Sequence, residues 1–388
     1  MERNALTLKE LEALVASMFT SATLSSRDPQ LIQNETAKVL NKIGLMITIR
    51  GRYVDKLEDL DGPELPLGKT IEEYFMELPK VLEEDRDGSE DGKPADPSFL
   101  PAYYSYSLPK KRIKITRRWD EYEEACQTEE QFLAFIAVIE ATIEESTIVY
   151  KYALKRELIG RGIKLIESII DATASGTALD GATITTSISN LPANLKAGDY
   201  IVATAGDNKG AYVITEAGIS SGDTLAEAIA ANLVTKYDLA EDIAKPTDTQ
   251  KGEAFIKAVL NDVEKASENS EGHSLNGACI GATEDLRLFT LPGVKSVLSV
   301  DVKAGAFHKD EVELGARLTS IKDFGNYSGR TWAVLCDVRT FVLFLGYINI
   351  RVRENADGDF INYVRHLRYT PFMSRSTFIK LYREPAGE

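Results

Sequence analysis

The sequence predicts an α+β protein, on three observations. A long polar segment with two extended arms stands directly before a single, very long helical pattern. The middle of the chain is rich in Thr, Ser, Ala and Gly, and the last third is a series of strand-like runs joined by short turns. A chain of 388 residues also exceeds the ~100–200 residues of one typical domain, so two or three folding units are expected.

Two amphipathic helices are expected in the first fifty residues. Thr7 and Glu10 form a capping box that opens the first helix, and Asp28-Pro29 opens the second, which continues to about Gly44. The apolar run over residues 45–49 predicts a short strand. Helices of this size without a following core are typical of an arm rather than of a domain.

A β-ribbon is predicted next. Residues 65–76 form its outgoing arm, residues 83–96 an acidic tip, and the return arm alternates apolar residues as far as Ile113 and Ile115. An isolated hairpin is marginally stable at best, so this ribbon is expected to lie on something else, such as a neighbouring copy. The basic run beyond the tip has two interpretations of equal weight, a solvated face or a surface that sets docking register by opposite charge. This run consists of Lys110, Lys111, Arg112, Lys114, Arg117 and Arg118.

One helix is predicted from Thr128 to about residue 170. Its apolar residues follow one stripe and its charged residues lie off it. At 1.5 Å per residue an unbroken helix of this length spans roughly 60 Å. Gly160 and Gly162 are candidate positions for a kink or an interruption.

The remaining chain predicts a small inserted α+β module over residues 172–242, a helix over 250–266 and a β-rich end. Within the module, strands are expected over residues 183–188, 200–205 and 211–215, and a helix over 224–233. The strand candidates of the last third are residues 294–302, 331–338, 341–352, 360–369 and 377–382.

Composition disfavours several classes of protein. The chain has 60 acidic and 45 basic side chains and a net charge of −15, which disfavours tight non-specific binding to nucleic acid or to an anionic membrane. It does not exclude a protein that lines a DNA-filled space without gripping the DNA. The sparse cysteines Cys126, Cys279 and Cys336 predict neither a disulfide framework nor a zinc site and suit a reducing cytoplasm. No signal-peptide run and no ~20-residue apolar span is visible.

The motifs that suggest chemistry are weak. Gly68-Lys69-Thr70 invites a phosphate-binding interpretation, but Pro63 stands where the first glycine of that loop belongs. Asp85, Asp87 and Asp91 lack the glycine and the terminal Glu of a calcium loop, so a solvated acidic tip is the better interpretation.

The histidines add no catalytic group. His273 lies near Cys279, but we expect no orienting carboxylate or nucleophile elbow to accompany them, and His308 and His366 are far away in sequence. We expect no catalytic, cofactor-binding or metal-binding residues.

Two sequence stretches carry a family resemblance. Asn41-Lys42-Ile43-Gly44-Leu45 and the later Pro66-Leu67-Gly68-Lys69-Thr70-Ile71-Glu72-Glu73 resemble the N-arm and the start of the extended loop of major capsid proteins from phi-29-like podophages. Those proteins have the HK-97-like fold, with an N-terminal arm, an extended β-hairpin loop, a long spine helix in a peripheral domain, and an axial domain. The expected segments are 1–50, the N-terminal helical arm; 51–118, the extended loop; 119–171, the spine helix; 172–242, the inserted module; 243–330, the axial domain; and 331–388, the β-rich return to the peripheral domain.

The resemblance implies a non-enzymatic major capsid protein, whose copies form hexamers and pentamers of an icosahedral or prolate shell around phage DNA. Implied partners are the portal protein, scaffolding or head-fibre proteins, and packaged double-stranded DNA without sequence-specific contact, but no membrane. The protein is expected in the virion after synthesis in the host bacterial cytoplasm. Expected assembly contacts are Pro66, Gly68, Lys69, Glu72, Glu73, Lys110, Lys111 and Arg112.

Two alternatives remain open. The first is another non-enzymatic phage structural protein, such as a tail or head accessory component. The second is a nucleotide-binding enzyme that uses Gly68-Lys69-Thr70.

Overall fold

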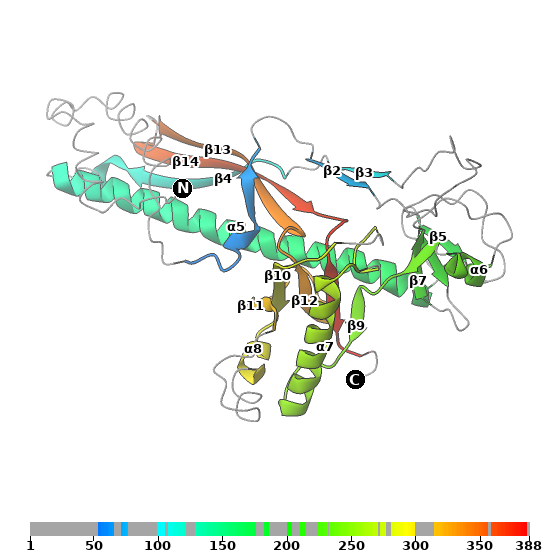
Figure 1. Cartoon of the computed structure of the whole chain (residues 1–388). Coiled ribbons are helices and arrows are strands. Elements are labelled where there is room, and N and C mark those ends of the chain that lie inside the picture. Colours follow the sequence, from blue (N-terminus) through cyan, green and yellow to red (C-terminus); the bar gives the residue numbers. More distant parts are fainter. Residues whose placement is uncertain are drawn as a thin grey trace. The chain divides into compact units, whose positions relative to one another are not determined.

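The computed structural model describes most of the chain beyond the first fifty residues (Figure 1). The described residues are 53–65, 71–76, 99–104, 108–121, 129–175, 182–185, 200–203, 210–214, 224–231, 233–270, 272–276, 281–298, 314–355 and 358–385. The two predicted arm helices, the strand over 45–49, the acidic tip and Gly68-Lys69-Thr70 lie outside them.

Contacts divide the chain into two units. The first comprises Met1–Lys69, Tyr106–Leu154 and Leu343–Pro371, and the second comprises Thr70–Ser105, Lys155–Val342 and Phe372–Glu388.

The first unit is built on a four-stranded sheet with the order β1-β13-β14-β4. These strands are β1 (Asp61–Glu64), which follows the short 3-10 helix η1 (Glu58–Leu60), β13 (Phe341–Asn355), β14 (Phe360–Met373) and β4 (Lys111–Arg118). Figure 1 shows β13, β14 and β4 side by side. Buried and half-buried residues alternate along β14 as the pleat of a strand requires, with Ile361, Tyr363 and Leu367 buried.

The long predicted helix is confirmed as α5 (Glu129–Ser175). Its residues as far as Leu154 belong to this unit. Leu343, Leu367 and Tyr369 of the sheet form a core against Tyr150 and Leu154 of the helix.

The predicted kink sites have a different role, because α5 continues through both glycines. A Cβ atom at Gly160 would lie 2.0 Å from the backbone oxygen of Phe324, and one at Gly162 would lie 2.5 Å from the ring of Phe341. The glycines therefore allow neighbouring chain to approach the helix closely.

The second unit holds a five-stranded sheet with the order β11-β10-β12-β15-β9. Its central strand, β12, is buried along its whole length, as expected where both faces are covered. Helix α7 (Thr249–Ser267) begins at Asp248, whose carboxylate accepts a hydrogen bond from the backbone N–H of Lys251 at 2.9 Å. The strands are β11 (Ala316–Ser320), β10 (Leu286–Thr290), β12 (Thr331–Asp337), β15 (Ile379–Arg383) and β9 (Ala240–Asp242).

Aromatic packing joins α7 to this sheet. The ring centroids of Phe255 and Trp332 are 4.7 Å apart, and those of Phe255 and Tyr382 are 5.2 Å apart in an edge-on contact. Trp332 is buried and is therefore a core residue.

The predicted module has its own four-stranded sheet, with the order β5-β6-β7-β8. Thr224 and Glu227 form a capping box at the start of its helix, and Ile201, Tyr212 and Leu225 lie in its core. The three strands and the helix predicted here are confirmed, whereas β8 was not predicted. The elements are β5 (Ala182–Thr185), β6 (Tyr200–Ala203), β7 (Gly210–Ile214), α6 (Leu225–Ala230) and β8 (Val234–Lys236).

Two predictions about strands are wrong. The outgoing arm β2 (Ile71–Met76) pairs with β3 (Phe99–Tyr104), whereas the alternating residues Ile113 and Ile115 belong to β4, which pairs with β14. Alternation identifies a strand but carries no information about its partner.

The strand predicted over 294–302 begins instead as the helical turn α8 (Val294–Val297). Gly293 adopts φ +95°, and Val294 packs into the core of the second unit, so tertiary contacts override the strand preference of valine.

Candidate functional site

One face of the sheet in the first unit gathers positive charge. Arg112 lies opposite His366 in the antiparallel register of β4 and β14, and Lys114 lies opposite Val364. Directly opposed residues share a face, and so do alternate residues along one strand. We define the basic face by its seven cations: Lys110, Arg112, Lys114, Arg118, Arg351, Arg353 and Arg368.

The basic face is the side of the sheet that points away from α5. Arg365, Leu367 and Tyr369 occupy the odd positions of β14, and Leu367 and Tyr369 pack in the core with helix residues. Arg365 donates a hydrogen bond to Glu144 of α5. The even positions of β14 therefore face outward, together with Arg112 and Lys114.

Aromatic rings help to position the cations of the basic face. The ammonium group of Lys110 lies 4.4 Å from the centroid of Tyr347, and that of Lys114 lies 5.9 Å from Phe360. The pKa of His366 is lowered, first by desolvation and then by four neighbouring cations, so the imidazole is neutral near pH 7. Those cations are Arg351, Arg112, Lys110 and Arg353. The surface therefore has a strongly positive potential.

The expected assembly contacts in the basic run separate into two groups. Lys110 and Arg112 belong to the basic face. Lys111 lies opposite the buried Leu367, so it projects from the other side of the sheet at the exposed edge strand.

The two acidic residues among the expected assembly contacts, Glu72 and Glu73, both lie on strand β2 of the ribbon. The Glu73 carboxylate accepts hydrogen bonds from the hydroxyl of Ser374 and from the backbone N–H of Arg375, the latter at 3.2 Å. Glu72 accepts a hydrogen bond from the hydroxyl of Tyr74 on the same strand. The other expected contacts, Pro66, Gly68 and Lys69, lie outside the described residues.

A buried carboxyl group stands where α5 meets the sheet. Glu140 is 3% exposed and lies one helical turn before Glu144, the hydrogen-bond acceptor of Arg365. Burial raises the pKa of Glu140 to about 7, the charge of Arg365 lowers it in part, and the charge of Glu144 raises it.

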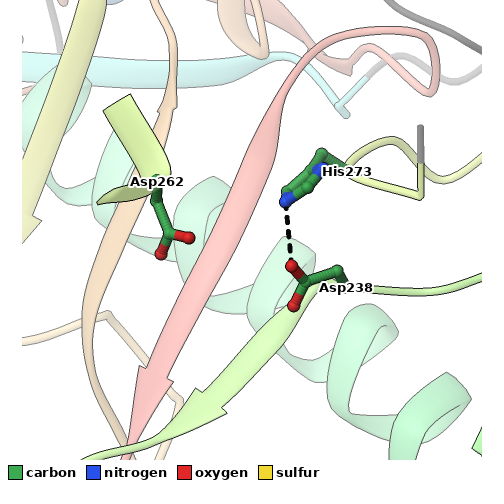
Figure 2. Close-up of side chains that lie close together, drawn as sticks. All are labelled: Asp238, Asp262 and His273. Atoms are coloured by element: carbon green, nitrogen blue, oxygen red, sulfur yellow. Dashed lines mark ion pairs between the residues drawn. The ribbon is translucent and has the colours of Figure 1, made fainter. Parts of the chain in front are cut away.

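Three residues of the second unit have the composition of a metal site. Asp238, Asp262 and His273 place one possible ligand atom each within 4.8 Å of one another, and Figure 2 shows the ion pair of His273 with Asp238, at 3.1 Å. Two lysines pair with the same carboxylates. The ammonium group of Lys380 contacts Asp238, and that of Lys265 lies 3.1 Å from Asp238 and 3.4 Å from Asp262.

These contacts make the cluster an ion-pair network rather than a metal centre. Burial on its own raises the pKa of Asp238, but the hydrogen bond from His273 and the charges of the lysines outweigh it and hold the pKa far below its usual range. The hydroxyl of Tyr382 donates to Asp262 at 2.8 Å. The ammonium groups already supply the positive charge that a cation would bring.

The weak catalytic candidates gain no support from the described residues. The expectation that no carboxylate accompanies His273 is wrong, because His273 pairs with Asp238, which comes from a distant part of the sequence. The His273 ring stacks on Phe378 with centroids 5.0 Å apart, while Cys279 lies outside the described part of the chain. Cys336 is fully buried, and burial raises the pKa of its thiol well above the ordinary value, so this cysteine is no nucleophile at neutral pH. None of the described helices combines the length and apolarity that crossing a membrane requires.

The sequence and the fold are both similar to those of phage capsid proteins. The sequence profile of the Phi29-like phage major capsid protein family matches residues 7–380. The chain is similar to one in the capsid structure of Staphylococcus phage Andhra, with TM-score 0.50 and 11% identity over 85% of this chain and 84% of that one. A chain of the mature capsid of bacteriophage PhiM1 gives TM-score 0.47 and 10% identity over 87% and 89% of the two chains. A search of curated protein sequences finds no match.

The Andhra similarity supports the predicted HK-97-like α+β fold. The family profile covers nearly the whole sequence, including both described units. The chain belongs to the Phi29-like phage major capsid protein family.

Proposed function

We propose that this major capsid protein builds an icosahedral or prolate phage head from hexamers and pentamers of itself. The observation that carries the proposal is the family match over residues 7–380. The role is structural and non-enzymatic, and the shell consists of many copies that each make several modest contacts. Closure of the shell multiplies those contacts, so no single interface needs to be strong.

The proposed division of labour follows the six segments of the sequence. The arm is residues 1–50, the extended loop 51–118, the spine helix 119–171, the inserted module 172–242, the axial domain 243–330 and the return to the peripheral domain 331–388. The loop, whose described arms are β2 and β3, rests on a neighbouring copy. Its two-stranded form supports this, because two strands alone are only marginally stable in water.

The outward residues of α5 also favour burial in an assembly. Over residues 136–154 the most exposed positions are Val138, Thr142, Ser146 and Val149, none of them charged. Val138 is 60% exposed, and Thr142 and Ser146 each bond a backbone carbonyl of their own helix at 2.8 Å. A helix that faces water normally carries charges on that side.

The proposed assembly contacts are Pro66, Gly68, Lys69, Glu72, Glu73, Lys110, Lys111 and Arg112. Glu73 has a specific part in this proposal. Its carboxylate binds Ser374 and Arg375 of its own chain, so it also fixes the base of the ribbon from which the contacts with a neighbour are made.

Further proposed partners are the portal protein, scaffolding or head-fibre proteins, and packaged DNA without sequence-specific contact. The net charge of −15 favours DNA that slides along the shell wall rather than DNA that is held there. Synthesis in the host bacterial cytoplasm belongs to the same proposal.

Negative-stain electron microscopy of the purified chain, alone and with proteins from a phage lysate, tests the proposed function. Closed shells are expected. Open tubes would support a tail component instead, and a monomer under every condition would overturn the proposal. Nucleotide binding that is lost in Lys69→Ala would revive the enzyme alternative.

A further inference from the structure

We propose that Lys380 and Asp238 become joined by an amide bond between the Nζ and Cγ atoms of their side chains, which the folded chain forms on itself. Both residues belong to the second unit, with Lys380 on β15 and Asp238 in the connection between β8 and β9. The bond is a modification within one chain. It goes beyond the proposed function, because it requires no second copy.

The first argument is that the backbone holds the two side chains together. The ammonium group of Lys380 contacts Oδ1 of Asp238. Strands β9 and β15 pair in parallel, and the backbone N–H of Leu381 donates to the carbonyl oxygen of Leu239 at 2.8 Å. The backbone N–H of Asp238 donates to the carbonyl oxygen of Gly272 at 2.9 Å. Fixed reactants of this kind avoid most of the entropic cost of meeting, which lowers the barrier to a reaction between them.

The second argument is a buried carboxylate that can carry a proton. Asp262 of α7 is fully buried, and its Oδ1 atom lies 4.0 Å from Nζ of Lys380. One carboxylate oxygen of Asp262 and one of Asp238 lie within 4.8 Å of each other (Figure 2). The hydroxyl of Tyr382 donates to Oδ2 of Asp262 at 2.8 Å and so orients this carboxylate. After a small rotation, Asp262 can accept a proton from Lys380 and pass it to Asp238.

The third argument is a pair of cationic or polar donors on the other oxygen of Asp238. Nε2 of His273 and the ammonium group of Lys265 each lie 3.1 Å from Oδ2. Negative charge develops on Oδ2 when an amine adds to Cγ, and donors at this distance stabilise that charge. The imidazole of His273 is held in place because it stacks on Phe378.

The fourth argument is burial of the charges. The Lys380 side chain is 2% exposed, and removing an ammonium group and a carboxylate from water is costly even when they pair. Amide formation replaces these two charges by one neutral group. The Asp238 side chain is 40% exposed, which gives the released water a path to solvent. The surroundings therefore favour the amide over the ion pair.

The reaction is a condensation that is balanced without a further reagent. Asp262 carries one ammonium proton from Lys380 to Oδ1 of Asp238, which leaves a neutral amine and a neutral carboxylic acid. The nitrogen lone pair attacks Cγ, the N–C bond forms, and the carbonyl electron pair moves onto Oδ2. The bond from Cγ to Oδ1 then breaks, and Oδ1 leaves with its electron pair as water. Two of the three ammonium protons depart with that water, and the third remains on the amide nitrogen.

Bond formation is expected to be slow. The lysines and His273 hold the carboxylate of Asp238 ionised, so the neutral pair that reacts is a minor state. The reaction needs to occur only once in each chain. Because both partners belong to one molecule, the rate should be first order and independent of protein concentration.

Mass spectrometry of the purified full chain tests the bond. After incubation of the folded protein, the denatured chain should weigh one water less than its sequence requires. Trypsin should release peptide 237–251 joined to peptide 376–383, in which the bonded Lys380 resists cleavage. Fragmentation of the joined peptides should place the link on Asp238.

Three variants identify the reacting groups. Lys380→Arg keeps the positive charge, but a guanidinium ion is a poor nucleophile, so the chain should keep its full mass. Asp262→Asn removes the proton carrier and should slow the appearance of the bonded chain roughly a hundredfold. Lys257→Arg, at an exposed position of the same helix α7, is the matched control and should react at the unmodified rate. Circular dichroism identifies variants that do not fold, and the mass of the unmodified chain decides the question without them.

The bonded and unbonded chains can also be compared at identical sequence. The link closes a long loop, since the two residues are 142 positions apart, and it therefore restricts the unfolded chain. Samples in which the bond has formed should unfold at a higher urea concentration than freshly folded samples.

The inference is overturned if the incubated chain has the full mass of its sequence and releases the two peptides separately, which would mean that Lys380 and Asp238 form an ion pair only. A link placed on Asp262, or a rate that rises with protein concentration, would overturn it as well. These measurements use the unassembled chain, so their outcome is independent of whether the chain forms shells.

Discussion

Arg365 of β14 donates a hydrogen bond to Glu144 of α5, across 221 residues of sequence. The arginine side chain is 4% exposed, so this pair joins helix and sheet inside the first unit. Glu140 lies one turn earlier on the same helix, and its buried Oε2 atom has no hydrogen-bond partner among the described residues. Two carboxyl groups therefore share one guanidinium, and only one of them is hydrogen-bonded to it.

Glu140→Gln should make the protein more stable above pH 7. The folded state holds the Glu140 proton up to about pH 7, whereas an unfolded chain loses it near the ordinary glutamate pKa of 4.5. The folded state therefore binds more protons between these values, and the free energy of unfolding falls as the pH rises through them. A full difference of this size corresponds to roughly 3 kcal/mol.

Thermal unfolding between pH 4 and pH 8.5 measures this effect. The variant should match the unmodified chain near pH 4 and exceed it at pH 8. Glu144→Gln is the control, and it should destabilise at pH 8 because it deprives the buried Arg365 of its bonded carboxylate. If the stability of the unmodified chain and of Glu140→Gln depended on pH in the same way, the pKa of Glu140 would not be raised by burial.

Gly160→Ala should destabilise the second unit even though alanine is the better helix former. The helix preference of alanine is worth about 1 kcal/mol. The new Cβ atom, however, would lie 2.0 Å from the backbone oxygen of Phe324, which cannot turn away as a flexible side chain can. Overpacking of this kind costs roughly 1–3 kcal/mol, so a net loss is expected in urea denaturation.

Gly281→Ala is the matched control, because a Cβ atom there has no neighbour within 4 Å. It should change the unfolding midpoint little. A Gly160→Ala variant that is more stable than the unmodified chain would show that the close approach of Phe324 to α5 is incorrect.

Lys380→Met should destabilise the second unit strongly. Lys380 is 2% exposed, contacts Asp238 and lies 4.0 Å from the fully buried Asp262. Its removal leaves buried carboxylate charge with less compensation, at a cost on the order of 3–5 kcal/mol. Differential scanning calorimetry measures the loss.

Two further variants test whether the loss of stability comes from the buried ion pairs of Lys380. Lys265→Met should cost less, because the Lys265 side chain is 40% exposed and water screens its ion pairs. Adding Asp238→Asn to Lys380→Met should recover part of the lost stability, since it removes one of the unbalanced charges. An equal cost for the two lysine variants would argue against a buried network centred on Lys380.

The sequence predicts elements in this protein better than it predicts their partners. Helix α5 is predicted by apolar residues that recur at helical spacing between Phe132 and Leu158, and β14 by its richness in β-branched and aromatic residues. The pairing of β4 with β14 could not be read in the same way. It joins residues more than 240 positions apart, for instance Thr116 and Asn362, and no local spacing encodes that register.

For the candidate sites too, the sequence indicates single residues or short runs but not the distant residues that join them. The basic run was visible in the sequence, but its extension onto β13 and β14 depends on the fold. The network of Asp238, Asp262, His273 and Lys380 had no local signal, because its members come from four separate segments. The two glycines of α5 were recognised as special, but their role is defined by Phe324 and Phe341, which approach from elsewhere in the chain.

Glu73→Ala should loosen the base of the ribbon in the unassembled chain. The Glu73 carboxylate binds the Ser374 hydroxyl and the backbone N–H of Arg375, about 300 residues away in sequence, and the substitution removes both hydrogen bonds. The backbone amides of β2 should then exchange with deuterium roughly tenfold faster, because each hydrogen bond to a charged group contributes about 1.5–3 kcal/mol before solvent screening. Glu72→Ala is the matched control on the adjacent residue. Among the described residues Glu72 bonds Tyr74 alone, on the same strand, so this substitution should leave that exchange unchanged. Equal protection of β2 in both variants would mean that the ribbon is held by other contacts and that Glu73 does not anchor it.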